Sequence, residues 1–432
     1  MIGGFILGSL GGCDSKSVSF LLFFILMAIP SLIHIPDFSY SQINDDIPQD
    51  LVDKKIVFSS LEPQDAAMSI DIMGRLDVTW KDSRDGNEEI YYLKVDSNGY
   101  KLNDDMRITF TQTNSTDPAI CSGRNKTTTL AWTEIVEEET EIRYSSLLYD
   151  GGDIEFLVDN QEISSVKNIT TKPVLGKRSD GSSILLWAEQ LGGGNTTIKG
   201  AWLDPFDGEN ISVKELYRFV GEVNHIDFEA INETEWAIAW NGQYNIGDSL
   251  DKNYGVFFSR FSDDGRSLMQ PTRKTISGNS TKPDMEIVDK IVNLVFSSDR
   301  YALSGIMYTS FELDGKDIVD DIPLTDDSNY CIHPSIRYDG NSVLSIVWYQ
   351  KEEDDFLLYQ KESDLGESIL QGPHFLLADN VMMEENLPCQ VFNRLGDMFA
   401  LYIKDDVNNG IHLINRMKPD LIVEELILFS SG

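Results

Sequence analysis

Short stretches of alternating apolar and polar residues cover most of the chain, and an aromatic residue returns in them at a nearly constant interval of 52 to 56 residues. The recurring positions are Trp80, Trp132, Trp187, Trp240, Phe296, Trp348 and Tyr402. Alternation with a period of two is typical of half-buried β-strands. A repeat of this length that contains only strand patterning predicts a solenoid or a propeller rather than a row of separate domains.

Each repeat carries the pattern of four strands. The first strand usually opens with a proline, which a strand tolerates at its first residue. These positions are Pro63, Pro118, Pro173, Pro283, Pro334 and Pro388, with His225 in the fourth copy. A tight turn such as Asp339-Gly340-Asn341 leads into the aromatic-bearing second strand. A third strand ends near an Asp and a Gly, as in Asp150-Gly151, and a weaker fourth strand follows, for example at 106–110.

Four antiparallel strands in each of seven repeats predict an all-β fold, a seven-bladed β-propeller of four-stranded antiparallel blades. The expected repeats are 61–112, 113–168, 169–221, 222–277, 278–327, 328–380 and 381–432. In such a ring the seven aromatics pack between neighbouring blades and have a structural role. Segments 54–60 and 425–431 both have strand character. We expect the N-terminal one to complete or extend the seventh blade, because an uncovered edge strand favours aggregation.

The N-terminus predicts export. Lys16 precedes an apolar run from Ser17 to Ile35, and small residues follow at 39–41, as before a signal-peptide cleavage site. The run is also close to the length of a membrane-spanning helix. Residues 1–41 are therefore expected to form a signal peptide or a membrane-anchor helix, followed by a linker at 42–53 and the propeller at 54–432. The body would be extracellular, secreted or anchored, and monomeric.

Seven Asn-x-Ser/Thr sequons fall in expected turns and are candidate glycosylation sites on an exported surface. They are Asn114, Asn125, Asn168, Asn195, Asn210, Asn232 and Asn279. After Cys13 of the leader, an odd number of cysteines is left: Cys121, Cys331 and Cys389. A bridge between Cys331 and Cys389 and buried unpaired thiols are both compatible with the sequence.

The net charge of −36 argues against nucleic acid as a partner, since phosphate contacts require clustered Lys and Arg. The loops expected between second and third strands contain 19 Asp and Glu but only 6 Lys and Arg, which predicts a strongly negative face. Such a face could bind Ca²⁺, which prefers several carboxylate and carbonyl oxygens. No loop has the spacing of a self-contained calcium site, so no cofactor is certain and the metal ligands, if any, are unknown.

The stretch from Trp80 to Tyr92, WKDSRDGNEEIYY, resembles the repeats of exported sialidase-like propellers, in which Trp-x-Asp and Arg-x-Gly precede an Ile-Tyr-Tyr strand. The resemblance covers the body as a blade pattern and is close only in the first repeat. The likeness to sialidases implies that family's catalytic set: three arginines that bind a substrate carboxylate, a tyrosine nucleophile paired with a glutamate, and an acidic proton donor. The Phe/Tyr-Arg-Ile-Pro signature that carries one of those arginines is absent here.

The sequence assigns no catalytic residue. It offers candidate ligand-binding residues in the expected rim loops: Asp82, Arg84, Asp85, Tyr244, Tyr254, Asp299 and Arg300. The longest of these loops is expected at 241–255 and contains both tyrosines, so it is the best candidate for a binding loop.

Three functions are open at this point. The preferred one is a binding or scaffolding module with an acidic rim, whose partner is an extracellular protein or a glycan. The first alternative is a divergent sialidase-like glycoside hydrolase, which would need two carboxyl groups at a hydrolytic separation. The second alternative is a structural protein of the cell envelope.

Overall fold

The computed structural model describes residues 43–44, 51–59, 61, 63–136, 139–166, 171–178, 180–191, 194–246, 249–250, 253–301, 303–326, 328–365, 369, 374–383, 386–404 and 409–417. All of them belong to the second of two compact units into which the chain divides, Ser41–Gly432. The expected leader at 1–41 and the strand-like segment at 425–431 lie outside the described residues. Within the described ranges, no helical stretch has both the length and the apolar character needed to pass through a bilayer.

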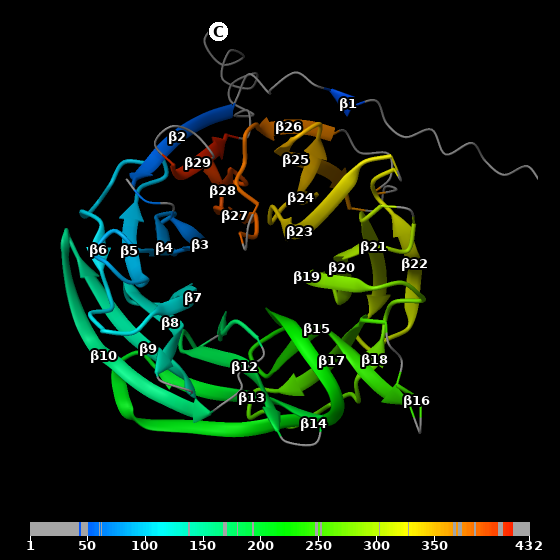
Figure 1. Cartoon of the computed structure of the whole chain (residues 1–432), viewed down its shortest axis with the longest axis horizontal. Coiled ribbons are helices and arrows are strands. Elements are labelled where there is room, and N and C mark those ends of the chain that lie inside the picture. The colour runs from blue at the N-terminus through cyan, green and yellow to red at the C-terminus, as the bar shows by residue number, and fades with distance from the viewer. Residues whose placement is uncertain are drawn as a thin grey trace, which may run out of the picture. The chain divides into compact units, whose positions relative to one another are not determined.

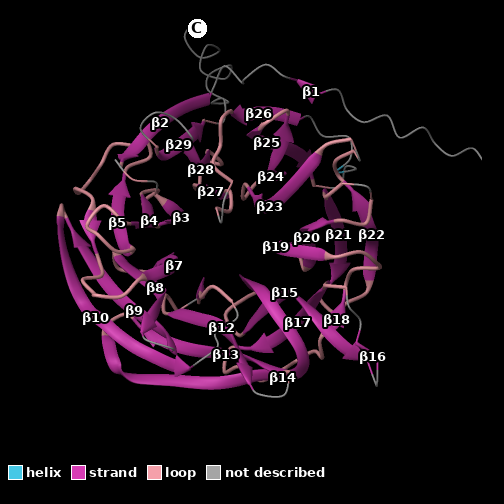
Figure 2. Ribbon diagram, viewed as in Figure 1, coloured by secondary structure: helices cyan, strands magenta, loops and turns pink. Residues whose placement is uncertain are grey.

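The described residues form an all-β structure built from four-stranded antiparallel sheets, and strand is nearly the only regular structure in it (Figure 2). Two of these sheets contain β3 (Gln64–Ile70), β4 (Leu76–Asp82), β5 (Glu89–Val95) and β6 (Met106–Arg107), and β7 (Ser115–Ser122), β8 (Thr127–Val136), β9 (Glu139–Asp150) and β10 (Asp153–Val166). Another contains β19 (Ser280–Val288), β20 (Ile291–Ser298), β21 (Gly305–Glu312) and β22 (Asp317–Pro323). The next contains β23 (Tyr330–Tyr338), β24 (Val343–Glu352), β25 (Asp355–Asp364) and β26 (His374–Ala378).

One long strand, β14 (Asp207–Ala230), serves two neighbouring repeats. Its partner changes at Gly221: up to Val220 it pairs with β13, and from Gly221 onward it pairs with β15. The change falls at the repeat boundary expected between residues 221 and 222. The other strands of these two repeats are β11 (Val174–Lys177), β12 (Ser183–Leu191), β13 (Asn195–Asp204), β15 (Glu235–Ile246), β16 (Ser249–Leu250), β17 (Gly255–Ser262) and β18 (Thr272–Arg273).

The two ends of the repeat region meet in one sheet. β2 (Leu51–Phe58) pairs in antiparallel fashion with β29 (Gly410–Arg416), next to β28 (Met398–Lys404) and β27 (Cys389–Phe392). The N-terminal strand therefore covers the outer edge of the last described sheet, as the sequence predicts. This closure gives the backbone groups of β29 a partner on both sides and makes β2 the outer edge strand of the sheet.

The segment expected to be a linker, 42–53, is partly strand. β2 begins at Leu51, and β1 (Ile43–Asn44) pairs in parallel with β26, where Ile43 lies opposite His374. The sequence has no apolar alternation at 43–44, so the pattern there does not predict a strand.

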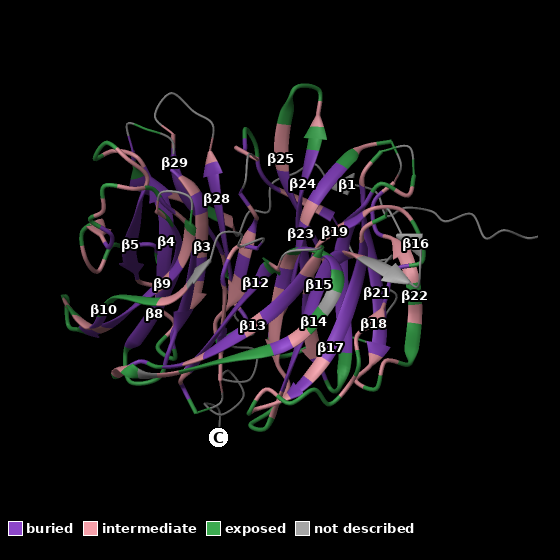
Figure 3. Ribbon diagram, turned by 60° about the horizontal axis from the view of Figure 1, so that its bottom comes forward, coloured by how far each residue is buried: buried purple, intermediate pink, exposed green. Residues whose placement is uncertain are grey.

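The core lies between the sheets. The seven recurring aromatics are all buried, each in the second strand of its repeat. Trp132, for example, packs with Ile90 and Tyr92 of the preceding repeat, so each sheet buries one flank against its neighbour. Figure 3 shows buried residues along the strands and exposed residues mainly at the turns. Figure 1 shows the sheets of this unit side by side, with first strands such as β3, β7, β19 and β23 nearest the centre.

Three of the aromatic positions, Trp80, Trp132 and Trp187, are followed two residues later by an acid on the same strand face. The indole Nε1 of Trp187 donates to Glu189 at 2.7 Å, and that of Trp80 donates to Asp82 at 3.4 Å. A buried N–H needs such an acceptor. At Trp80 and Trp187 the acid supplies this acceptor, whereas the Trp132 indole nitrogen has no hydrogen-bond partner among the described residues.

Two expected boundaries are wrong. The fourth strand expected at 106–110 ends at Arg107, because the following residues turn to the buried carboxylate of Glu89, which accepts a hydrogen bond from the Thr111 N–H at 3.1 Å. The loop expected to start at Asn241 begins later, because β15 continues to Ile246 and forms a hairpin with β16.

Candidate functional site

Polar side chains stand near the start of the innermost strands, where the pairing with the second strand is interrupted. The register shifts between Gln64 and Ala67 in β3, and equivalent shifts occur in β7, β19 and β23. The residue inside each shift has a positive φ, and these residues are Asp65 (52°), Asp117 (54°), Lys282 (51°) and His333 (55°). Such bulges redirect a side chain, and left-handed backbone at a residue other than glycine costs energy that often marks a functional position.

The equivalent position in each of the seven expected repeats, near the start of the first strand, holds a charged or polar residue. We call the set the central cluster: Asp65, Asp117, Lys172, His225, Lys282, His333 and Asn386. Each comes from a different repeat, so residues more than 300 positions apart are brought together. Hydrogen bonds and ion pairs link five of them: Asp65, Asp117, Lys172, His333 and Asn386. Lys282 and His225 are included by their positions in β19 and β14.

Lys172 connects three repeats at the centre. Its ammonium forms an ion pair with Asp65, and its distance to Asp117 Oδ1 is 3.4 Å. Lys81 also approaches Asp65, with 3.5 Å between Nζ and Oδ2. The two carboxylates of the cluster are thus ion-paired with lysines.

Asn386 joins the first repeat to the sixth. Its side-chain oxygen accepts the Asp65 main-chain N–H at 2.8 Å, and its carbonyl oxygen lies 3.1 Å from Nδ1 of His333. A carbonyl can only accept, so Nδ1 of His333 carries the hydrogen. Nε2 is then the ring nitrogen with a lone pair available to accept a proton.

Both histidines of the cluster are held in the neutral form. Burial, with the positive charges of Lys282 and Lys172, lowers the pKa of His333 to about 4. Burial and the same two lysines, with His333 itself, hold the pKa of His225 well below its usual range. Lys282 and His333 occupy the same bulge position in β19 and β23. The cluster therefore combines cations with two unprotonated imidazoles at neutral pH.

Further along the same inner strands lies a second group, which we call the carboxyl cluster: Asp227, Glu229, Asp284, Glu286 and Arg337. Asp284 Oδ2 accepts from Arg337 Nη1 at 2.8 Å and from the Ile336 N–H at 2.7 Å. Asp227 accepts the Met285 N–H at 2.8 Å. These bonds tie β14, β19 and β23 to one another.

The carboxyl cluster has too few cations to keep all its acids ionised. Burial, aided by the charge of Asp284, raises the pKa of Glu286 to about 7 although Arg337 opposes the shift. Burial and neighbouring carboxylates also raise the pKa of Asp227 and of Glu229 well above the ordinary range. Protons therefore remain bound in this cluster near neutral pH.

The candidate residues expected from the sequence lie in the loops and are held by local partners. Asp82 is buried and accepts from Arg84 Nη2 at 2.6 Å; Arg84 also lies 3.2 Å from Asp105. Asp85 accepts a hydrogen bond from the hydroxyl of Tyr91. This group supports the first repeat and does not belong to the central cluster.

The remaining candidates lie in two other repeats. Tyr254 donates its hydroxyl to Glu222 at 2.8 Å, and Tyr244 lies opposite Gly221 in the β14–β15 ladder. Asp299 accepts the Asn279 N–H at 2.7 Å, and the guanidinium of Arg300 pairs with Asp321. The structure does not bring the expected candidates together at one place.

Sequence reasoning missed the central cluster, although a signal for it was present. Four of its members, Asp117, Lys172, Lys282 and His333, directly precede the prolines that open the first strands. Aligning the repeats on those prolines would have shown charged or ionisable residues at the same position in successive repeats. The expectation of a strongly negative face is incomplete for this reason, since the loops are acidic but the centre carries lysines.

The structure also bears on the cysteines, the metal site and the sequons considered from the sequence. Cys121, Cys331 and Cys389 are free thiols, so the bridge considered between the last two is absent. Within the described ranges, no group of three or more His, Cys, Asp and Glu has the arrangement of a metal site. Asn125 and Asn232 are exposed, whereas the side-chain amide of Asn279 donates to Asp299 at 2.8 Å. Asn168 lies outside the described residues.

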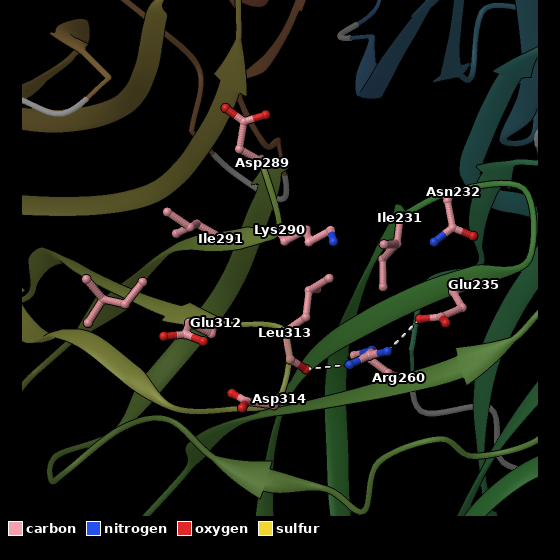
Figure 4. Close-up of a pocket in the computed structure, with 11 residues that line it drawn as sticks. Ile231, Asn232, Glu235, Arg260, Asp289, Lys290, Ile291, Glu312, Leu313 and Asp314 are labelled. Carbon is pink, nitrogen blue, oxygen red and sulfur yellow. Dashed lines mark hydrogen bonds and ion pairs between the residues drawn. The ribbon is translucent and has the colours of Figure 1, made fainter.

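A hollow of about 760 Å³ opens at the other ends of β14, β17, β19 and β21. Figure 4 shows Arg260 between Glu235 and Leu313, and its guanidinium donates to both, at 2.5 and 2.9 Å. Asp289, in the turn after β19, also lines it, seven residues or about 20 Å along the strand from Lys282. This hollow is thus on the opposite face from the central cluster, and its arginine already has partners.

The sequence matches no known protein family and no curated protein. Among solved structures, an ulvan lyase of a new family of polysaccharide lyase, bound to GlcA(1-4)Rha3S, is 9% identical with a TM-score of 0.56, over 83% of this chain and 94% of that chain. The polysaccharide lyase Uly1 is 10% identical with a TM-score of 0.50, over 82% and 89%. An α-L-arabinofuranosidase from Fusarium graminearum is 11% identical with a TM-score of 0.50, over 69% and 93%.

At such low identity these likenesses concern the fold, which is all-β and propeller-like, as the sequence predicts. The resemblance to sialidase-like repeats is supported only at this coarser level, since the similar structures are other carbohydrate-active enzymes.

Proposed function

We propose that this chain is a carbohydrate-active protein, a seven-bladed propeller that binds an anionic saccharide at the central cluster and cleaves it by elimination. The observation that carries the proposal is the convergence of Lys172, Lys282, His225 and His333 on one place. Similar structures that are polysaccharide lyases support the choice of ligand class. The test below also distinguishes the two other functions considered from the sequence. These are the glycoside hydrolase alternative and the scaffolding function that the sequence analysis prefers.

The lysines favour a ligand with a carboxylate or a sulfate. An acidic protein surface alone would repel such a ligand, but cations at the centre of a ring of sheets attract it locally. Lys282 stands at the bulge of β19, in the position that His333 occupies in β23, and it is assigned to the sugar carboxylate.

The neutral histidine supplies a base. In a 4-linked uronate, Nε2 of His333 would take the proton from C5, the C4–O4 bond would break, and a double bond would form between C4 and C5. The leaving oxygen would take a proton from water. Lys282 would stabilise the negative charge that develops on the carboxylate when C5 loses its proton.

Hydrolysis is the less favoured second candidate. It requires a carboxylic acid that donates a proton beside a second carboxylate. Asp65 and Asp117 are both ion-paired with Lys172. Glu286, with a pKa of about 7, lies four residues or about 13 Å along β19 from Lys282.

The test is incubation of the purified protein with a panel of polymeric uronates, including polygalacturonate and the glucuronate–rhamnose-3-sulfate polymer. Ultraviolet absorbance of the unsaturated product and new reducing ends are followed together. Elimination produces both signals, and His333→Gln should lower kcat/KM by about 100-fold or more, with His412→Gln as the matched control. Reducing ends without absorbance would indicate hydrolysis, and binding without either signal would indicate a glycan-binding scaffold.

The proposal includes export, because the leader expected at residues 1–41 would deliver the body to where extracellular polysaccharides occur. Fractionation of cells that produce the full chain tests it: the protein should be found in the medium or on the outer surface. Recovery only from the cell interior would contradict this part.

A further inference from the structure

A hollow of about 340 Å³ lies between the first and last described sheets. Its lining is Leu61, Gln64, Lys81, Asp82, Ser83, Glu88 and Asn409. The volume is at the lower end of the range for small-ligand sites, which is about 300–1,000 Å³. None of these side chains was assigned to a ligand by the proposed function.

The hollow adjoins the central cluster directly. Gln64 precedes Asp65 in β3, and Lys81 has its ammonium 3.5 Å from Asp65 and 3.1 Å from Glu88. Lys81 is therefore shared by the two places. A saccharide with one sugar unit at the central cluster would have its neighbouring sugar unit in the hollow.

The chemistry of the lining fits an uncharged sugar. Amide, hydroxyl and carboxylate groups can bond to sugar hydroxyls in both directions, and Leu61, which is 47% exposed, offers an apolar edge for the face of a pyranose ring. The lining carries two carboxylates, Asp82 and Glu88, against the single ammonium of Lys81, so a second anion would be repelled on balance. The Asn409 side-chain oxygen is buried and accepts no hydrogen bond from a described group.

We propose that this hollow is a second subsite, which binds an uncharged sugar unit next to the charged unit at the central cluster. The inference rests on the proposed function and names its substrate class more closely: a polysaccharide in which uronate and uncharged sugars are joined. A polymer made of charged units alone would gain little from the second subsite.

Calorimetry with D-glucuronate and with tetrasaccharides of alternating glucuronate and N-acetylglucosamine, from hyaluronan and from heparosan, tests this. At least one tetrasaccharide should bind the wild-type protein about 10-fold tighter than glucuronate or more, equal to about 1.4 kcal/mol. Tetragalacturonate should not show this gain.

Two variants separate the subsite from the central cluster. Ser83→Trp fills the hollow and should lower tetrasaccharide affinity to that of glucuronate while glucuronate still binds, which also shows that the variant is folded. Asn409→Ala, a smaller change, should remove part of the gain. Leu395→Trp, at a residue 76% exposed and outside the lining of the hollow, is the control and should change neither affinity.

A full tetrasaccharide gain in Ser83→Trp, or the same gain with tetragalacturonate, would overturn the second subsite and leave the proposed function intact. Absence of glucuronate binding to the wild-type protein would instead contradict the proposed function itself.

Discussion

Arg337 on β23 pairs with Asp284 on β19, with 2.8 Å between Nη1 and Oδ2, and this ion pair holds two inner strands of neighbouring sheets together. The guanidinium faces the carboxyl cluster, where the charges of Asp284, Asp227, Glu286 and Glu229 hold the pKa of Arg337 above its ordinary value against the effect of burial. The packing of the inner strands therefore depends on balancing acids with one arginine.

Replacing this arginine should destabilise the fold. Arg337→Met removes the cation and leaves carboxylates facing one another, at an expected cost of about 1–3 kcal/mol, less than for a fully buried pair because Arg337 is partly exposed. Urea unfolding should show a larger loss at pH 8 than at pH 5, where protonation relieves the repulsion. Arg218→Met, which removes an exposed ion pair with Glu215, is the control and should cost less than about 0.5 kcal/mol.

Glu286 should make stability depend on pH. Its pKa is about 7 in the folded protein and 4.5 ordinarily. Between these values the unfolded chain has released a proton that the folded chain keeps, so stability falls as pH rises through this window. Glu286→Gln should flatten that fall and be more stable than wild type at pH 8 by about 1 kcal/mol or more. Parallel pH profiles for the two proteins would show that Glu286 ionises normally.

Lys282 should control the two central histidines. Burial is the main cause of the low pKa of both rings and the charge of Lys282 adds to it, so Lys282→Met should raise the pKa of His333 from about 4 part of the way toward the ordinary 6.5, and that of His225 in the same direction. Imidazole proton resonances followed against pH by NMR measure this without any substrate. Lys290→Met, at an exposed turn, should leave both values unchanged, and unchanged values in the Lys282 variant would place its ammonium away from the rings.

The acid two residues after Trp187 should stabilise the fold through the indole. Trp187→Phe removes a charge-assisted hydrogen bond to Glu189, whereas the Trp132 indole nitrogen has no hydrogen-bond partner among the described residues. Both substitutions remove similar buried volume. Trp187→Phe should therefore cost about 1–2 kcal/mol more in thermal unfolding than Trp132→Phe. Equal costs would mean that the Trp187 bond adds nothing to stability.

Much of the fold could be predicted from the sequence because local patterns of residues determine it. Alternation fixes strands, and the interval from Trp80 to Tyr402 fixes the repeats. Closure by β2 followed from the apolar character of residues near Ile56. Sequence patterns could not show that β14 would run through two repeats, since pairing partners are chosen by tertiary packing.

The candidate site was harder to predict, because its members come from separate repeats and meet only when the sheets assemble. Asp65 and Lys172 are 107 residues apart, and only an alignment of the repeats would have related them. The loops drew attention to Arg84 and Arg300 because charged loop residues are conspicuous. In the structure each is paired with a nearby acid, Asp82 for Arg84 and Asp321 for Arg300.

The most direct measurement of the central claim is an NMR titration of D-glucuronate into the wild-type protein, observed at the imidazole resonances of His225 and His333. Both should shift and saturate, glucose at the same concentrations should leave them unchanged, and Lys282→Met should abolish the effect. Unmoved central histidines, or equal shifts with glucose, would contradict a saccharide-anion site at the centre of the sheets.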